Sequence, residues 1–367
     1  MILKRFSATN FRNIEECNVE FKPGVNLLHG RNAQGKTNAI EGIYIFSRGK
    51  SFRAREDAEL VKFGSPGFRI AIEYDKKSGS ESLEYALYGK ERLRKKNGYK
   101  ISRVTEMVGN FKSVLFYPDD LGLVKNGPEG RRSFLNIAAS QCYPAYMKHY
   151  ADFKKALDNR NCILKFIQKG LFADRNELYS WSSMMAEYSS YIYLLREDYI
   201  KRLSFYAKKV MRDISSGKED IEITHKCDIK TDSLEREKIR EKYERVFLTD
   251  NEAEFSAGLT LHGPHRDDIV ISLNGKDARY FASQGQQRSA VLALKLAEGE
   301  VIREVTGEYP VYLFDDVLSE LDEIRRRYVL EDAGEKQIII TSCDPDELLG
   351  FTTNEIDVCD GRYSVDG

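Results

Sequence analysis

The segment GRNAQGKT at residues 30–37 has the residue types and spacing of a loop that holds phosphate groups. Gly30 and Gly35 let the backbone fold closely around an anion, and the amides at the start of a following helix point at it. Lys36 is expected to reach the β- and γ-phosphates of a nucleotide, and the Thr37 hydroxyl to bind Mg²⁺. An apolar run precedes the loop and a helical pattern follows it, so the sequence predicts a nucleotide site.

A second segment that could do chemistry is the apolar run YPVYLF, which ends on Asp315 and Asp316. A carboxylate at the end of a buried strand beside a phosphate loop holds Mg²⁺, usually through water, and Asp315 fits that role together with Thr37. Asp316 is expected near the γ-phosphate, where a carboxylate orients or deprotonates the attacking water. We therefore expect Asp316 and Lys36 to be the catalytic residues. The two acids could also simply cap the next helix.

The third segment, SQGQQ at residues 283–287, opens a helix of strong helix formers. It contains no nucleophile with a base beside it and no cluster of metal ligands. One interpretation is a helix N-cap formed by Ser283. The other is an anion site built from the exposed amides and the dipole at the start of the helix. Taken alone, the segment favours the N-cap.

Residues 38–314 separate the phosphate loop from Asp315. This distance is far longer than a compact P-loop domain needs, so a large insertion is expected. From Trp181 to Ile214 there is no Gly or Pro, and apolar residues recur at steps of three and four, which indicates one long amphipathic helix. A similar pattern from Tyr146 to Ile167 indicates an antiparallel partner, and the charged segment 233–247 a further helix.

Strand patterns flank the helical insertion. Residues 68–102 alternate at period two around a Gly-Ser turn and predict an antiparallel meander, and residues 258–276 predict another pair of strands. The predicted fold is α/β, with an ATPase lobe formed by residues 1–116 and 255–367 and a helical lobe at 117–254.

The overall charge gives no sign of a nucleic-acid partner. The formal net charge is −1, so any such binding must come from a local patch. Two basic segments are candidates for DNA contacts, GKSFRAR with Arg53 and Arg55, and KERLRKKNGYK with Lys95 and Lys96. Solvated side chains on an exposed hairpin are an equally good interpretation of either segment.

Composition also bears on metals and location. The 6 cysteines are scattered without a CxxC pair, which argues against a zinc site and against a disulfide framework. The first residues alternate apolar and polar types and include acids, unlike a signal peptide, and the apolar runs are too short to cross a bilayer. We expect a cytoplasmic protein without a membrane segment. His262 and His265 lack a third ligand at metal spacing, and a turn stabilised by Pro264 is the better interpretation of their segment.

The order of the three motifs resembles that of ABC-type ATPases. In that superfamily the signature loop completes the nucleotide site of a second subunit, which implies a role in trans for Ser283, Gly285 and Gln286. Blocks along nearly the whole chain narrow the resemblance to the RecF family, which is related to SMC proteins: ATNFRNIEE, GRNAQGKTNAIEGIYIFSRGKSFR, LFYPDDLGLVKNGPEGRRSFLN, TLHGPHRDD, SQGQQRSAVLALKLA and LFDDVLSELD. Asn126 and Asn136 replace a glycine and an aspartate usual in the family, at positions that hold neither phosphate nor metal.

This resemblance implies an ABC-type ATPase head, a mixed sheet plus an antiparallel β meander, with an inserted all-helical second lobe. It implies ATP and Mg²⁺ as cofactors and an ATP-dependent homodimer, with Asp322 at the dimer interface. It also implies binding to duplex or gapped DNA without base specificity, and cooperation with RecR and RecO proteins in placing RecA on DNA. The residues implied to contact ATP are Arg12, Asn13, Gly30, Asn32, Gly35, Lys36, Thr37 and Asn38.

Thr341 and Ser342 argue against a histidine that senses the γ-phosphate, and Asp316 predicts slow ATP hydrolysis. Thr341 and Ser342 stand where transport ATPases of this superfamily carry a histidine that senses the γ-phosphate. Asp316 stands where many relatives have a glutamate, and its shorter side chain places a carboxylate less well for activating water. We therefore expect ATP to act mainly as a switch that closes a clamp. A nucleotide-binding scaffold without turnover and a transport ATPase subunit are the alternative functions.

Overall fold

The computed structural model describes residues 1–231, 233–331, 335–344, 351 and 353–365. The chain divides into two compact units, the first made of residues 1–121, 206–220 and 283–367 and the second of residues 122–205 and 221–282. The expected boundary at residue 255 is corrected by this division, because residues 255–282 group with the second unit. Their strands pair with a strand at residues 221–226, which sequence patterns did not reveal.

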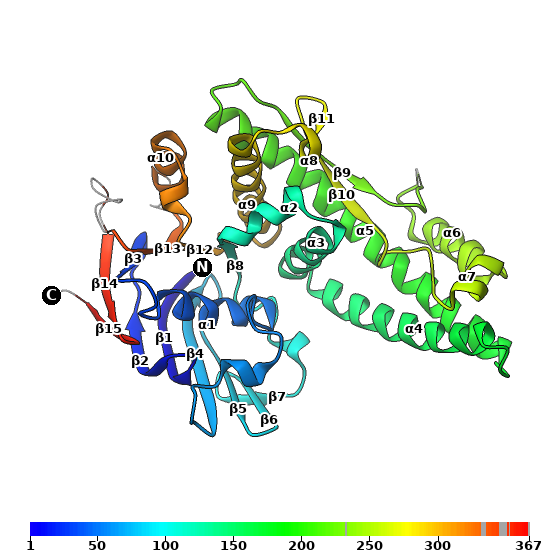
Figure 1. Ribbon diagram of the computed structural model, residues 1–367, viewed down its shortest axis with the longest axis horizontal. Helices are drawn as coiled ribbons and strands as arrows, with labels where there is room; N and C mark the ends of the chain where they lie inside the picture. Colours follow the sequence, from blue (N-terminus) through cyan, green and yellow to red (C-terminus); the bar gives the residue numbers. More distant parts are fainter. Residues whose placement is uncertain (232, 332–334, 345–350, 352, 366–367) are drawn as a thin grey trace. The chain divides into compact units, whose positions relative to one another are not determined.

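A mixed six-stranded sheet forms the centre of the first unit (Figure 1). Its strand order is β15-β14-β3-β13-β12-β8, and all neighbours are parallel except β14 and β15. Strands β3, β12 and β13 lie in the middle and are buried along almost their whole length, as expected for parallel strands covered on both faces. The strands are β3 (Val25–His29), β8 (Ser113–Phe116), β12 (Val311–Asp315), β13 (Gln337–Ser342), β14 (Thr353–Cys359) and β15 (Arg362–Val365).

An antiparallel six-stranded sheet packs on the other side of helix α1 (Lys36–Arg48) and confirms the predicted meander. One apolar core contains residues from both sheets and from α1. At Gly42 the helix approaches the sheet so closely that a Cβ atom would lie 2.6 Å from the Phe6 ring. The strands, in sheet order, are β2 (Ile14–Glu20), β1 (Ile2–Phe11), β4 (Gly67–Lys76), β5 (Gly79–Tyr88), β6 (Glu91–Lys96) and β7 (Tyr99–Ile101).

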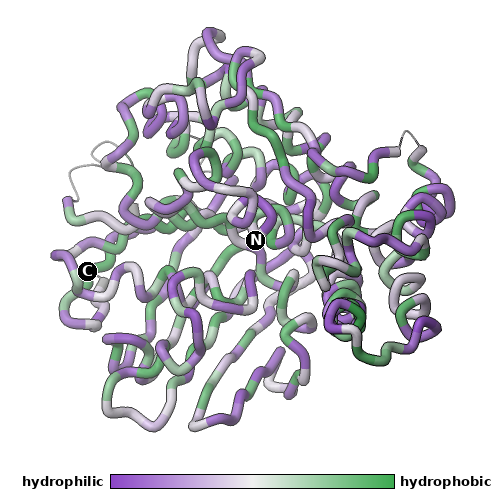
Figure 2. The backbone as a smooth tube through the Cα atoms, turned by 45° about the vertical axis from the view of Figure 1, so that its right-hand side comes forward, coloured by the Kyte–Doolittle hydropathy of each residue, from purple (hydrophilic) through white to green (hydrophobic). Residues whose placement is uncertain are grey.

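The remaining helices of the first unit follow the mixed sheet. Helix α9 (Gln284–Thr306) is buried along most of its length and ends at Gly307, which takes the left-handed conformation. Helix α10 (Glu323–Glu331) follows β12. Figure 2 shows hydrophobic stretches of chain in the interior and hydrophilic ones on the peripheral loops. The short 3₁₀ helices are η1 (Asp57–Leu60), η2 (Val104–Glu106), η3 (Pro118–Leu121) and η4 (Leu318–Glu320).

Two long helices are the main elements of the second unit, as predicted from the apolar residues that recur at steps of three and four. They are α4 (Pro144–Gln168) and α5 (Arg175–Ile214), whose last residues belong to the first unit. Their apolar faces share one core with α6 (Arg236–Leu248). The unit also contains a three-stranded sheet, in the order β11-β10-β9, and is therefore not purely helical. Its other elements are α2 (Gly122–Lys125), α3 (Pro128–Cys142), β9 (Ile221–Lys226), α7 (Glu252–Ala257), β10 (Asp268–Leu273), β11 (Lys276–Asp277) and α8 (Ala278–Phe281).

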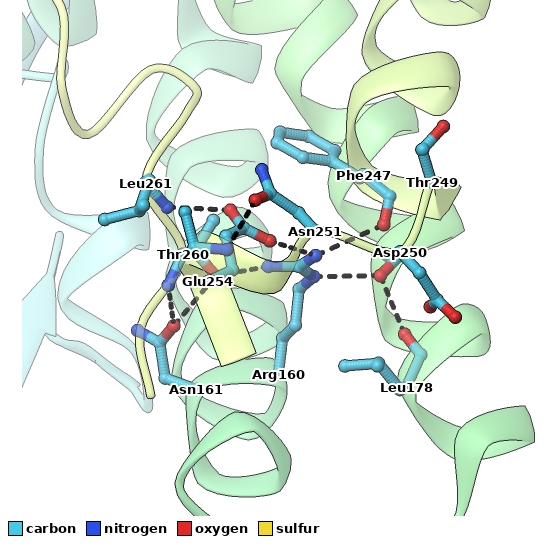
Figure 3. A network of polar contacts seen from close by, with 12 residues as sticks. Arg160, Asn161, Leu178, Phe247, Thr249, Asp250, Asn251, Glu254, Thr260 and Leu261 are labelled. Carbon is cyan, nitrogen blue, oxygen red and sulfur yellow. Dashed lines mark hydrogen bonds and ion pairs between the residues drawn. The ribbon is translucent and has the colours of Figure 1, made fainter. Parts of the chain in front are cut away.

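A buried ion pair ties α4 to α7 within the second unit (Figure 3). The Arg160 guanidinium contacts Glu254 Oε2 at 2.7 Å, and both side chains are 2% exposed. Arg160 also donates to the Ser182 hydroxyl, the Thr260 hydroxyl and the Phe247 carbonyl oxygen. Because the charges are paired and hydrogen-bonded, the arginine is accommodated in the interior of the unit. Among the described residues, none of the helices is both long enough and apolar enough to cross a bilayer.

Candidate nucleotide site

The phosphate loop connects β3 to α1 in the first unit. Gly30 has a φ of 149°, and a Cβ there would lie 2.2 Å from the Val358 carbonyl oxygen of β14. Gly35, which precedes α1, has a φ of 120°. Both positions therefore require glycine, for backbone conformation and, at Gly30, for space as well. The Lys36 ammonium is buried and donates to the carbonyl oxygens of Gly30 at 2.6 Å and Arg31 at 3.0 Å.

The C-terminal hairpin β14–β15 holds the phosphate loop from one side. The Gln34 side-chain oxygen accepts from the Asp360 amide at 2.6 Å, and the Gln34 carbonyl oxygen accepts from the Gly361 amide at 2.8 Å. The Tyr363 hydroxyl donates to the Gly35 carbonyl oxygen at 2.9 Å. Sequence analysis missed this support, since no motif marks it.

Residues expected to hold the metal lie in contact at the end of the central strands. The Thr37 hydroxyl donates to Asp315 Oδ1 at 2.8 Å, and the Thr341 hydroxyl approaches the same oxygen at 3.0 Å. Burial raises the pKa of Asp315, and the hydrogen bonds from Thr37 and Thr341 oppose that rise. A hydroxyl and a carboxylate are hard oxygen donors, the kind that Mg²⁺ prefers, so this pair fits the ion.

Asp316 lies beside the metal residues in a different environment. Its side chain is exposed, and its backbone has a φ of 51°, in the left-handed region. The Asp316 amide donates to the Thr341 hydroxyl at 3.0 Å. Thr341, noted in the sequence only for not being a histidine, therefore contacts both acids and helps to fix their positions.

Three further residues expected to bind ATP, all asparagines, lie in the phosphate loop or beside it. The Asn38 amide group donates to Asn13 Oδ1 at 2.7 Å, and Asn13 lies within 3.4 Å of the Ala33 carbonyl oxygen. The Asn32 side-chain oxygen accepts from the Cys343 thiol at 2.8 Å, and the Lys36 ammonium lies 3.3 Å from the same sulfur. The position of Cys343 against the loop was not foreseen from the sequence.

Arg12 forms an ion pair with Glu41, a partner that the sequence did not suggest. Its Nε and Nη2 donate to the two carboxylate oxygens of Glu41 at 3.0 and 2.7 Å, and Glu41, on α1, is fully buried. Arg12 Nη1 also donates to the Glu59 carbonyl oxygen. Its contact with nucleotide stays a prediction, and the geometry shows that Arg12 also links η1 to α1.

Of the four basic residues expected to contact DNA, three lie near acidic side chains. Arg53 donates to Asn38 Oδ1 at 3.1 Å and lies 3.7 Å from Glu41, so it belongs to the surroundings of the phosphate loop. Arg55 is exposed. Lys95 pairs with Glu84 at 3.2 Å, and Lys96 with Glu81 at 3.5 Å. These carboxylates reduce the positive charge that the sequence indicated for strand β6.

The start of α9 contains the expected signature residues. Ser283 caps the helix, accepting from the Gln286 amide, while the Gln286 side chain accepts from the Ser283 amide at 2.9 Å. Ser283 and Gly285 are exposed, and a Cβ at Gly285 would meet nothing within 4 Å. The N-cap interpretation is therefore confirmed, and it leaves the first amides of the helix accessible for a second role.

Asp322 lies between the acidic strand and α10. Its carboxylate accepts from the Arg325 amide at 2.9 Å and pairs with the Arg325 guanidinium. Arg325 in turn donates to the Ser289 hydroxyl of α9 at 2.6 Å. Asp322 is thus linked through Arg325 to the helix that begins with the signature residues.

A buried charge cluster occupies the middle of α9. Lys295 lies 3.7 Å from Asp120 of η3 and 3.5 Å from Glu298, and all three residues are buried. Burial raises the pKa of Asp120 to about 6 and that of Glu298 to about 7, against the opposing effect of Lys295. Burial alone would lower the pKa of Lys295, but the two carboxylates outweigh it and the net shift is upward. The cluster joins α9 to the segment that follows β8.

Comparison with known proteins agrees with this architecture. The family described as RecF/RecN/SMC N terminal domain matches residues 2–356. The proteins named DNA replication and repair protein RecF from Clostridioides difficile (strain 630) and Clostridium novyi (strain NT) are 37% and 39% identical to this chain, over 94% and 93% of it and 92% of each relative.

Solved structures show the same likeness. A structure of the recombination mediator protein RecF with ATP, in the RecFOR pathway, has a TM-score of 0.92 at 34% identity and covers 100% of this chain and 98% of that one. The Smc head domain of Pyrococcus furiosus has a TM-score of 0.57 at 15% identity, over 100% of this chain and 96% of that one, and shares the fold. The ABC-type ATPase fold predicted from the sequence is thereby confirmed.

Proposed function

This chain belongs to the RecF family of DNA replication and repair proteins, which are ABC-type ATPases, and from that premise we propose that it uses ATP to join two copies of itself around DNA. ATP acts as a switch in this proposal. Binding closes the dimer on duplex or gapped DNA, and slow hydrolysis releases it. The held DNA is then accessible to RecR and RecO, which assist in the loading of RecA.

The nucleotide step rests on the loop and the acidic strand. Lys36 turns from the loop carbonyls to the β- and γ-phosphates, and the amides at the start of α1 bind phosphate oxygens. Thr37 and Asp315 would hold Mg²⁺, since their oxygens lie together beside the phosphate loop. When bound, this ion neutralises charge on the phosphates. Asp316 orients the attacking water, and its exposed, short side chain accounts for a low rate.

The observation that carries the dimer proposal is the exposed start of α9. Ser283 is fixed by its reciprocal hydrogen bonds with Gln286, and Gly285 leaves space for a large anion to approach the backbone. Backbone amides in the first turn and the helix dipole at this end attract a phosphate. In the dimer the phosphate is the γ-phosphate of ATP held by the other copy. Asp322 lies at the interface of the two copies.

The DNA step requires no base-reading element. Contacts to backbone phosphates supply most of the affinity, so binding falls steeply with salt concentration and changes little with base sequence. Arg55 remains a candidate for such contacts, whereas Lys95 and Lys96 are partly neutralised by Glu84 and Glu81. A difference above about tenfold between DNA sequences of equal structure would contradict this part of the proposal.

Sedimentation of the protein with and without Mg-ATP tests the switch. We expect ATP to double the particle mass of the parent and to leave Lys36→Ala monomeric, because the variant loses the cation that binds the phosphates. DNA binding, measured in parallel, should become ATP-dependent in the parent only. If Lys36→Ala binds DNA as the parent does, and ATP does not change the mass of the parent, the nucleotide is a structural ligand of a scaffold.

The transport-subunit alternative has less support. Such ATPases carry a histidine at the position of Thr341, and here the Thr341 hydroxyl instead contacts the two acids of β12 and its end. The match to the RecF family covers nearly the whole chain.

A further inference from the structure

Strand β9 and helix α5 bring three different metal-binding side chains together in the second unit. His225 lies near the end of β9, and Cys227 directly follows the last residue of the strand. Glu197 comes from α5 and faces them. The Glu197 carboxylate, the His225 ring nitrogen and the Cys227 sulfur all lie within 4.8 Å of one another.

The histidine is oriented as a metal ligand requires. His225 Nδ1 faces the Glu197 carboxylate at 2.5 Å, and Nε2 lies 3.2 Å from Asp267 Oδ2. Metal-binding histidines commonly direct their other ring nitrogen to a carboxylate, which fixes the tautomer and strengthens the bond. Asp267 is itself held by Arg196 Nη1 at 2.8 Å, and both are buried. The ring therefore cannot rotate away from Glu197 without breaking a buried network.

We propose that Glu197, His225 and Cys227 bind a borderline divalent ion of the Zn²⁺ type, which cross-links α5 to β9. Imidazole and thiolate select Zn²⁺ over Mg²⁺ and Ca²⁺, which prefer oxygen ligands alone. The Glu197 side chain is 33% exposed, so the ion has access from solvent, and water supplies the fourth ligand. The site is independent of the nucleotide site.

Binding of the ion has a defined proton balance. Zn²⁺ takes the place of the proton in the contact between the His225 ring and the Glu197 carboxylate, and Cys227 coordinates as a thiolate, so its thiol proton is released to solvent. A small opening of the short contact between Glu197 and His225 admits the ion, since zinc bonds to nitrogen and oxygen are about 2.0–2.2 Å long.

Metal titration of the full chain without nucleotide tests the proposal. After treatment with a chelator, the protein is titrated with Co²⁺ as a spectroscopic probe and then with Zn²⁺. We expect one ion per chain, a thiolate-to-cobalt charge-transfer absorption, and a rise in Tm with Zn²⁺. Cys227→Ser should lose the absorption and weaken Zn²⁺ binding by at least about tenfold.

Cys162→Ser is the matched control, because Cys162 is an exposed cysteine of α4 in the same unit. It should behave as the parent does. Glu197→Gln removes a ligand at a partly exposed position, and should weaken Zn²⁺ binding even if Cys227→Ser lowers the Tm of the metal-free protein. The proposal is overturned if the parent gives no thiolate absorption, or if the absorption persists in Cys227→Ser and so comes from another cysteine.

Discussion

Ser283→Asp separates the observed role of the start of α9, the N-cap, from the proposed one, contact with a phosphate of the other copy. Aspartate is as good an N-cap as serine, and its charge is favourable at a helix N-terminus by about 0.3–1 kcal/mol. The reciprocal hydrogen bonds with Gln286 can be kept. We therefore expect the free energy of unfolding of the monomer to stay the same or to rise slightly.

The affinity of the two copies for each other in the presence of ATP should fall in Ser283→Asp, although the stability of the monomer does not. In the proposed dimer the new carboxylate faces the γ-phosphate. Two like charges about 4 Å apart repel by about 4 kcal/mol at an effective dielectric constant of about 20, which corresponds to a roughly thousandfold weaker ATP-dependent dimer. Ser283→Ala adds no charge. It should lower the free energy of unfolding by about 1 kcal/mol through loss of the cap, and weaken the dimer far less.

Sedimentation equilibrium with and without Mg-ATP gives the dimer affinity, and denaturant titration gives the stability. Ser78→Asp, in the exposed turn between β4 and β5, controls for added charge. Nucleotide affinity of each monomer should be unchanged, since Ser283 acts on the other copy. If Ser283→Asp dimerises with ATP as tightly as the parent, the start of α9 is an N-cap only and the reasoning is refuted.

Three other changes give independent tests. Glu254→Gln leaves a buried guanidinium without its counter-charge and should lower the free energy of unfolding by about 3–5 kcal/mol in urea, whereas the exposed Glu252→Gln of the same helix should be neutral; equal effects would exclude a special role for the pair. Glu298 has a pKa of about 7 in the folded protein, above its ordinary 4.5, so its contribution to stability is present below pH 4.5 and lost as the pH rises to about 7. Denaturation across this range should show that decline, and Glu298→Gln should reduce it. Thr341→Val removes the hydroxyl between the two acids and should slow ATP hydrolysis by about 10–100-fold with nucleotide binding retained; an unchanged rate would limit Thr341 to packing.

The sequence predicted those parts of the site in which chemistry and backbone geometry are local. Gly30, Gly35, Lys36 and Thr37 lie within one loop whose spacing dictates its conformation. The carboxylate at the end of β12 was predicted because a run of apolar residues closing on acids is itself a local signal. Parallel strands then bring Thr37 and Asp315 together without any further information.

The sequence could not predict those contacts of the site that join segments far apart in the chain. Nothing in residues 360–363 signals that they hold the phosphate loop, and Cys343 has no motif that connects it to Lys36. The unit boundary expected at residue 255 was wrong because β10, which follows it, pairs with β9 of the inserted lobe. Residues 255–282 therefore belong to the second unit. Arg53 and Lys95 were equal candidates for DNA contacts in the sequence. In the structure Arg53 lies near Glu41 beside the phosphate loop, whereas Lys95 pairs with Glu84 in the antiparallel sheet.

The strand order of the mixed sheet also governs how the protein can be made. Strands β3 and β8 are synthesised early, yet β13 and β12 lie between them in the sheet. At about 5–20 residues per second, β3 waits roughly 15–60 s for β13, and β8 roughly 10–40 s for β12. Until then their edges are open, as sites for chaperones or for mispairing. A nascent chain that lacks the last strands also lacks the hairpin that supports the phosphate loop, so the nucleotide site is complete only when synthesis is nearly finished.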